Sequence, residues 1–257
     1  MIDPPLQPQD LTALHERIAK ATSLFHGHQY YRHNCRRQEH LASLKLDLHG
    51  KSVLEVGAGV GDHTSFFLDR DCSVISVEPR AENCELFAAA MRSLHSAGYH
   101  KASKVGLVQG DVESLGRLIV DQFDVVYCYG LLYHLADPRS AIEAMAARCR
   151  GLLLLETCVS FGNQDELNPI RELQADPTQS FYGLGCRPTR NWVFKNLKTF
   201  FPFVYAPLTQ PAHEEFPIDW LPPYPQQLLV RAVFVAARHP ITNDQLVDYL
   251  PGHQRRC

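Results

Sequence analysis

Residues 53–62 have the sequence VLEVGAGVGD, in which an apolar run is followed by three alternating glycines, Gly57, Gly59 and Gly61. The apolar run predicts a buried β-strand, and the glycines predict a sharp turn into a helix. Glycine has no Cβ atom, so the backbone of such a turn can approach a ligand at the helix N-terminus. The segment therefore predicts a ligand site at the end of the first strand of an α/β fold.

The spacing of these glycines narrows the class of ligand. It is Gly-x-Gly-x-Gly, whereas the turn that holds a dinucleotide pyrophosphate has the pattern Gly-x-Gly-x-x-Gly. Glu55 lies two residues before the first glycine. A carboxylate is unfavourable beside phosphates and favourable beside a sulfonium or an amino group. We therefore expect a ligand that carries a positive charge, and a nicotinamide-dependent oxidoreductase is disfavoured.

From residue 51 onward, short apolar runs alternate with segments of helical period. This alternation predicts a doubly wound, mostly parallel sheet with helices on both faces. Asp137 and Pro138 supply a capping carboxylate and a first-turn proline to one of these helices. Seven strands are predicted, at residues 52–56, 73–77, 105–109, 123–128, 152–157, 203–207 and 228–236.

Two more carboxylates are expected at the same edge of the sheet as the glycine turn. Glu78 ends the second strand, where an acidic residue can accept hydrogen bonds from both hydroxyls of a ribose. Asp111 follows the third strand, in place to accept from an adenine amino group beside the backbone N–H of Val112. Each alone could be a helix cap or a surface charge. Together, at the carboxyl ends of successive parallel strands, they predict a nucleoside site.

The whole chain, residues 1–257, is predicted to form one domain. Residues 1–50 would form an N-terminal cap with helices at 10–25 and 34–46, residues 51–240 the α/β core, and residues 241–257 a tail. Two segments without regular period interrupt the core, at about 159–190 and 207–226. Irregular insertions of this length are commonly functional loops. We therefore expect the N-terminal helices and the insertions to cap the active site.

These segments resemble the class I, Rossmann-like S-adenosylmethionine-dependent methyltransferases, whose first motif is similar to residues 55–61, ExGxGxG. The resemblance covers roughly residues 50–157, and it implies a strand order that continues to about residue 237 with an antiparallel last strand. It implies S-adenosyl-L-methionine as cofactor, with the glycine loop at the methionine part, Glu78 at the ribose and Asp111 at the adenine.

Residues 127–138, YCYGLLYHLADP, leave the fourth strand and enter a helix. They resemble the Gly-x-x-Tyr-His-x-x-x-Pro segment of several small-molecule methyltransferases and of a tRNA wobble-uridine carboxymethyltransferase family. The resemblance implies that the segment passes beneath the transferred methyl group. His134 is then a candidate base, because histidine titrates near neutral pH; the alternative is that it only caps or packs. Tyr133 is grouped with His134 at the reaction centre and Tyr129 with the cofactor contacts, and both are expected to pack or to contact the cofactor and not to act as acids.

Further site residues are expected on either side of this core. Arg36, Arg37 and His40 lie on the helix before the first motif, where an arginine could bind the methionine carboxylate by paired hydrogen bonds, and Arg36 is the one assigned to the cofactor. A solvated basic face is the alternative. The predicted acceptor contacts are Glu156 at the end of the fifth strand, and Arg187, Trp192 and His213 from the insertions. For each of these the alternative is a core or surface role.

The composition excludes several classes of protein. The formal net charge is −3 without a basic stripe, which disfavours a nucleic-acid partner. The longest apolar run, residues 151–155, is far shorter than the roughly 20 residues that cross a bilayer, and the first ten residues do not match a secretory signal. We therefore expect no membrane partner and a cytoplasmic location. Neither Cys-x-x-Cys nor His-x-x-x-His occurs, so we expect reduced thiols and no metal site.

The sequence thus predicts methyl transfer from S-adenosyl-L-methionine to an oxygen or nitrogen atom of a small molecule, by an enzyme that could form a homodimer. Two alternatives stay open. One is a tRNA-modifying transferase that uses a cofactor derived from S-adenosylmethionine, suggested by the Tyr-His segment. The other is a catalytically silent protein that keeps the fold for heterodimerisation.

Overall fold

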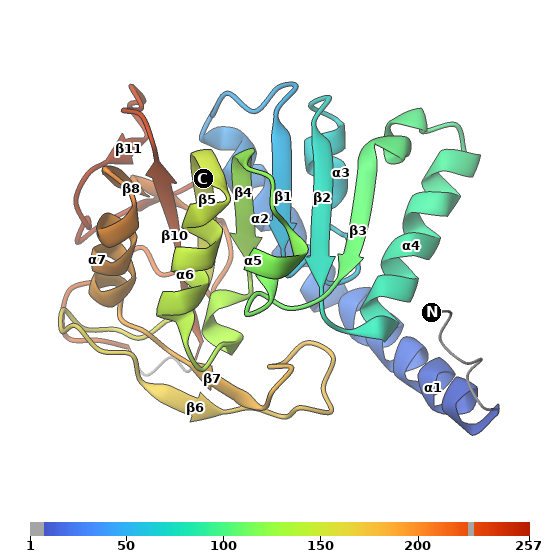
Figure 1. Cartoon of the computed structure of the whole chain (residues 1–257). Coiled ribbons are helices and arrows are strands. Elements are labelled where there is room, and N and C mark those ends of the chain that lie inside the picture. The colour runs from blue at the N-terminus through green and yellow to red at the C-terminus, as the bar shows by residue number, and fades with distance from the viewer. Residues whose placement is uncertain (1–7, 226–228) are drawn as a thin grey trace.

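The computed structural model describes residues 8–225 and 229–257, which form a central sheet flanked by helices (Figure 1). The eight strands lie in the order β11-β8-β10-β5-β4-β1-β2-β3. Their bounds are β1 Ser52–Val56, β2 Ser73–Glu78, β3 Val105–Gln109, β4 Phe123–Tyr129, β5 Cys149–Val159, β8 Phe203–Pro207, β10 Val230–Ala237 and β11 Leu246–Val247. The strands β1 to β5 are parallel, and β10 runs antiparallel to both β5 and β8. The predicted fold class is therefore confirmed.

The count of seven strands was wrong by one. The additional strand β11 lies in the predicted C-terminal tail and pairs antiparallel with the outer edge of β8. It is only two residues long, which gives no apolar run for a sequence pattern to detect. The predicted start of the last strand at Leu228 lies outside the described residues.

The remaining elements are helices and short strand pairs. The helices are α1 Pro8–Phe25, α2 His28–Ser43, α3 Thr64–Leu68, α4 Ala81–Ser96, α5 Leu115–Leu118, α6 Pro138–Ala147 and α7 Arg190–Phe200, with 3₁₀ turns η1 His100–Lys104 and η2 Leu132–His134. The short strands are β6 Pro169–Arg171, which pairs with β7 Leu184–Cys186, and β9 Thr209–Gln210, which pairs with β12 Arg255–Arg256. No helix of the described chain is both long and apolar enough to span a bilayer.

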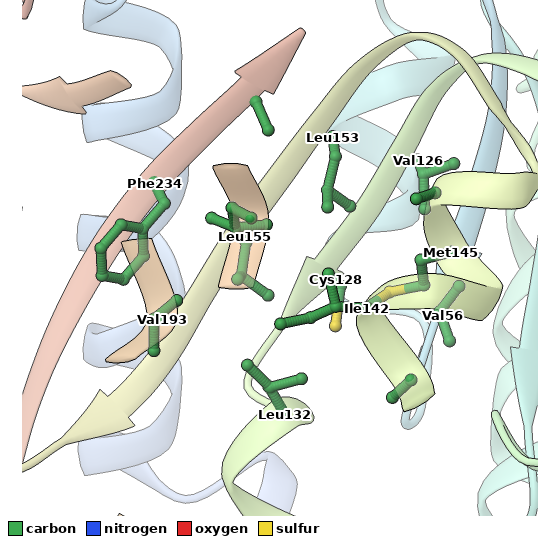
Figure 2. Packing of buried hydrophobic residues seen from close by; sticks show 14 of the residues in the cluster. Val56, Val126, Cys128, Leu132, Ile142, Met145, Leu153, Leu155, Val193 and Phe234 are labelled. Carbon is green, nitrogen blue, oxygen red and sulfur yellow. The ribbon is translucent and has the colours of Figure 1, made fainter. Parts of the chain in front are cut away.

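Each parallel strand alternates its side chains between two hydrophobic clusters, because successive residues of a strand point to opposite faces. On one face, Val126 and Leu155 pack with Ile142 and Met145 of α6 and with Val193 of α7, as Figure 2 shows. The opposite face packs against α2 and α3. Both faces of the central strands are buried, which explains their nearly continuous apolar sequences.

The chain changes direction in the sheet between β1 and β4. From β1 it runs outward through β2 and β3, and it then returns to place β4 and β5 on the other side of β1. The connection that follows β1 therefore lies on one face of the sheet and the connection that follows β4 lies on the other. A crevice opens between them at the carboxyl ends of the two strands. This edge of the sheet is at the bottom of Figure 1, where α1 and the β6–β7 hairpin lie beneath it.

Two expectations about the segments around this edge need correction. Helix α2 begins at His28, six residues before the expected start at residue 34. Gly27 is its N-cap in extended conformation, and Tyr30 of its first turn packs edge-on against Phe25 with ring centroids 5.0 Å apart. The insertion at 159–190 is also less irregular than expected, because it contains the β6–β7 hairpin.

The expected helix start at Asp137 is confirmed. Its side chain accepts a hydrogen bond from the backbone N–H of Ser140 at 3.1 Å, and Pro138 occupies the first turn of α6. This cap fixes where the Tyr-His segment ends and the helix begins.

Candidate active site

A cavity of about 250 Å³ opens at the carboxyl ends of β1, β2, β3 and β4. Most of the residues predicted for the cofactor and the reaction centre line it, and Arg187 is the one predicted acceptor residue that does. These lining residues are Glu55, Gly57, Gly59, Glu78, Asp111, Val112, Tyr129, Tyr133, His134 and Arg187.

The glycine turn is held to the second strand by a buried carboxylate. The backbone N–H of Gly59 donates to Oε2 of Glu78 at 2.9 Å. The other oxygen of Glu78 accepts from Nδ2 of Asn83 at 3.0 Å and from the backbone N–H of Arg80 at 3.1 Å. Burial raises the pKa of Glu78, although these hydrogen bonds lower it. Glu78 therefore both lines the cavity and fixes the shape of the loop beside it.

Glu55 lies beneath the same loop, with 2% of its surface exposed. Its Oε2 accepts hydrogen bonds from the hydroxyls of Thr64 and Ser76, both at 2.7 Å. Burial raises the pKa of Glu55 to about 7 in spite of these two bonds. Its carboxyl group therefore changes protonation state near neutral pH, at a position that lines the cavity.

Gly61 was predicted to contact the cofactor, but it does not line the cavity. Its φ is +87°, and a Cβ atom added there would lie 2.6 Å from Cδ2 of Phe87 on α4. Phe87 is fully buried. The third glycine thus allows the turn to pack against α4, which is a steric role that the motif alone does not distinguish from ligand contact.

The carboxylate of Asp111 is already bonded on both oxygens. Ser114 donates to Oδ1 from its backbone N–H and from its hydroxyl, both at 2.7 Å, and the hydroxyl of Tyr182 donates to Oδ2. Although partial burial raises the pKa of Asp111, these hydrogen bonds bring it below the usual value. Tyr182 belongs to the insertion at 159–190, so the insertion covers the place predicted for the adenine.

The side chain of His134 is joined to a carboxylate that the sequence analysis missed. Its Nδ1 shares a hydrogen bond with Oε2 of Glu172, in the loop between β6 and β7. Glu172 also accepts from the backbone N–H of Ser180 at 2.8 Å and from both terminal nitrogens of Arg187 at 3.1 Å. No hydrogen bond within the described residues reaches the other ring nitrogen of His134.

The protonation states of this pair follow from its surroundings. Burial lowers the pKa of His134, and the hydrogen bond and charge of Glu172 oppose that shift only in part. Burial raises the pKa of Glu172, but its bonds to His134 and Ser180 and the charge of Arg187 bring it below the usual value. At neutral pH the pair is therefore a neutral imidazole beside a carboxylate, with Nδ1–H donating to Glu172 and Nε2 left as an acceptor.

A buried ion network forms one wall of the cavity. Glu156 is fully buried and accepts from Nη1 of Arg37 at 3.1 Å and from Nη1 of Arg231 at 3.0 Å. Arg231 also donates to the hydroxyl of Tyr133 at 3.1 Å. Burial raises the pKa of Tyr133 against the lowering effect of Arg231, so its hydroxyl stays protonated.

Four other predicted site residues do not line the cavity. Arg36 pairs with Glu39 at 2.5 Å on the outer side of α2, and the adjacent Arg37 lines the cavity instead, because successive helix residues are rotated by about 100°. Glu156 lies behind the two arginines. Trp192 packs against the core on α7, and His213 lies beside His33.

Three buried polar atoms of lining residues have no hydrogen-bond partner in the described chain: Nε of Arg37, Oδ1 of Asn83 and the hydroxyl oxygen of Tyr129. Buried polar groups in folded proteins are nearly always paired. Their gathering around one cavity fits a ligand with both donors and acceptors, as a nucleoside joined to an amino acid would have. Asn83 is not part of the predicted set, and the position of its side chain depends on the packing of α4.

The same segments match known proteins. Residues 54–151 match a family described as a methyltransferase domain. Residues 54–151 are a methyltransferase domain, and the sheet to which they belong has the class I fold. Outside the region 54–151, the sheet continues through β10, β8 and β11.

Two curated relatives and one solved structure are similar to this methyltransferase domain. A tRNA U34 carboxymethyltransferase of Alteromonas mediterranea is 30% identical over 128 residues, 49% of this chain and 36% of that protein. A ubiquinone biosynthesis O-methyltransferase of Psychrobacter arcticus is 32% identical over 106 residues, 41% of this chain and 39% of that protein. The chain therefore matches less than half the length of each.

The solved structure is the N-terminal domain of EvdMO1 with S-adenosylhomocysteine bound. Its TM-score is 0.57 with 21% identity, over 79% of this chain and 80% of that one. The likeness supports the class I fold independently of the sequence motif.

Proposed function

We propose that this chain transfers a methyl group from S-adenosyl-L-methionine to an oxygen or nitrogen atom of a small-molecule acceptor. The observation that carries the proposal is one cavity in which the glycine turn, Glu78 and Asp111 lie at the strand ends and His134 faces the same space. The curated relatives include an O-methyltransferase, and the solved structure that is similar to this chain holds S-adenosylhomocysteine.

The residues around the cavity divide into three binding regions for the cofactor. The backbone of Gly57 and Gly59, with the side chain of Arg37, would hold the methionine part. Glu78 would accept the ribose hydroxyls. Asp111 and the Val112 backbone would bind the adenine, with Tyr182 over them. The unpaired polar atoms at the cavity are consistent with these assignments.

His134 would take the proton of the acceptor. When bound, S-adenosyl-L-methionine supplies an electrophilic methyl group and leaves as a neutral thioether. As the acceptor atom gains the methyl group, its proton passes to Nε2 of His134, because Nδ1–H is held by Glu172. Glu172 is a positioning residue, since it fixes the ring and the tautomer without touching the acceptor.

The rim of the cavity supports an acceptor with an apolar or aromatic part. Phe181, Tyr182 and Leu229 line the cavity and are 37%, 50% and 41% exposed. Large apolar side chains gathered at one cavity mouth are typical of a binding surface.

Calorimetric titration with S-adenosyl-L-methionine and with NADH tests the cofactor assignment. We expect S-adenosyl-L-methionine to bind saturably and NADH not to bind. Glu78→Gln should bind S-adenosyl-L-methionine roughly 10- to 100-fold more weakly, because the N–H of Gly59 loses its charged acceptor and faces a neutral amide. Glu85→Gln, an exposed substitution on α4, is the matched control and should bind as wild type. Release of S-adenosylhomocysteine with a panel of phenols, carboxylic acids and amines then tests the activity. Tight binding without turnover on any of them would favour a silent protein.

The affinity for S-adenosyl-L-methionine is expected to rise with pH up to about 7 and then to level off. The pKa of Glu55 is raised to about 7, so below that pH the carboxyl group must lose a proton before it can stabilise a cationic ligand. Each pH unit below about 7 would then weaken binding by up to about tenfold. Titrations between pH 5.5 and 8.5 measure the slope. Glu55→Gln should remove the part of this pH dependence that is due to Glu55, whereas the part due to protonation of the ligand should remain. An unchanged slope in the variant would show that Glu55 does not cause the pH dependence.

Glu172→Gln is expected to move the acidic limb of the turnover profile to lower pH. The base works only when it is deprotonated, so activity falls as pH drops through the pKa of His134, which is below its usual value. Removing the Glu172 charge lowers that pKa further. Asp165→Asn, at an exposed carboxylate of the same insertion, is the control. A general loss of structure would lower the plateau without moving the limb, and an unmoved limb would exclude the pair.

A second candidate function is modification of tRNA, which the similarity to the carboxymethyltransferase favours. Filter binding of tRNA at two salt concentrations separates it from the first. Submicromolar binding that falls steeply with salt would favour tRNA, because phosphate contacts release counterions.

A further inference from the structure

Three potential metal ligands meet beside the cavity wall although they are far apart in the sequence. His33 lies on α2, and His213 and Glu215 lie between β9 and β10. One ligand atom from each lies within 4.8 Å of the others. Both histidines are 6% exposed, and Glu215 retains 27% of its side-chain surface. This cluster is the one group of this kind found in the described chain.

The geometry of His33 points to a missing partner. Its Nε2 is buried and has no hydrogen-bond partner in the described chain, and it faces Oε2 of Glu215 at 3.7 Å, too far for a hydrogen bond. The rings of His33 and His213 have centroids 4.9 Å apart and are inclined by 50°. An unpaired buried nitrogen costs stability, so a ligand between the three side chains would account for it.

One oxygen of the Glu215 carboxylate is hydrogen-bonded, and the other can accept a ligand. Nε of Arg231 donates to its Oε2 at 2.6 Å, whereas no described residue donates to Oε1. Arg231 is also paired with Glu156, which in turn pairs with Arg37, so the two buried arginines are balanced by two carboxylates. The formal charges of these four groups cancel, and an outer contact such as that of Arg231 orients metal-binding carboxylates.

We propose that His33, His213 and Glu215 bind a divalent transition-metal ion of the zinc class. Two imidazoles and one carboxylate are a donor set that such ions prefer. The three ligand atoms lie within 4.8 Å of one another, and they would move closer together to coordinate one ion. The ion joins α2 to the segment before β10, and so it fixes the helix that presents Arg37 to the cavity. The proposal does not depend on the methyl-transfer reaction.

The test uses full-length protein without a histidine tag, treated with a chelator and then titrated with Zn²⁺ or Co²⁺. We expect one ion per chain at micromolar affinity or better, visible absorption from bound Co²⁺, and a rise in melting temperature with Zn²⁺. Glu215→Gln and His33→Ala should weaken Zn²⁺ binding by about 10- to 100-fold or more and abolish the thermal shift.

The matched control is His253→Ala, because His253 also lies beside a carboxylate, Asp219 at 3.4 Å, but both are exposed. It should bind Zn²⁺ as wild type does. Glu215→Gln keeps the proposal testable if His33→Ala does not fold, as circular dichroism will show. The proposal is overturned if wild type binds no stoichiometric ion, if Glu215→Gln binds Zn²⁺ as tightly as wild type, or if His253→Ala loses the ion.

Discussion

Replacing His134 with glutamine is expected to lower turnover by about 10² to 10⁴-fold, the range in which a positioned general base contributes. The imidazole keeps 10% of its side-chain surface exposed, its Nδ1 is bonded to Glu172, and its pKa is lowered, so wild type holds a neutral base at pH 7. Glutamine occupies similar space but cannot accept a proton. Single-turnover measurement of S-adenosylhomocysteine, with the best acceptor of the panel, reads the methyl-transfer step directly.

Binding and turnover should separate in this variant. His134 does not belong to any of the three cofactor regions, so the Kd for S-adenosyl-L-methionine should stay within about threefold of wild type. His100→Gln, at an exposed histidine remote from the cavity, controls for the loss of a histidine as such. Turnover within about threefold of wild type in His134→Gln would remove the residue from the mechanism and leave it a packing role.

Much of the cofactor side of the site could be predicted from the sequence because its determinants are local. A buried strand, a glycine turn and an acidic residue at the next strand end occupy fixed places along the chain, and parallel strands bring their carboxyl ends to one edge. The structure accordingly brings Gly57, Glu78 and Asp111 to one cavity. The roles of these residues toward the cofactor stay predictions until binding is measured.

The acceptor side could not be predicted in the same way, because its contacts join segments that no short pattern connects. Glu172 lies 38 residues from His134 and reaches it only through the β6–β7 hairpin. The choice of Arg37 over Arg36 depends on a 100° difference in helix phase, and neither charge nor spacing decides it. The expectation of no metal site rested on local spacing, whereas His33 and His213 are separated by most of the chain.

Gly61 shows a case where the motif predicted the residue type but not its reason. Gly61→Ala is expected to destabilise the protein by about 2–5 kcal/mol. An L-residue in left-handed backbone costs about 1–2 kcal/mol, and forcing a Cβ atom against a buried ring adds about 1–3 kcal/mol. The ring is that of Phe87, 2.6 Å from the added atom, and it is fully buried and cannot move aside at low cost.

Gly98→Ala separates these two contributions. Its φ is +92°, close to the +87° of Gly61, but nothing lies within 4 Å of an added Cβ atom. Gly98→Ala should therefore lower the free energy of unfolding only by the cost of the left-handed backbone, about 1–2 kcal/mol. Urea unfolding measures the free energy of unfolding of both variants, which are compared where the free energy falls with urea concentration at the same slope. A difference near zero would mean that the close approach of α4 does not constrain the third glycine, and that the motif requires glycine there for its backbone conformation alone.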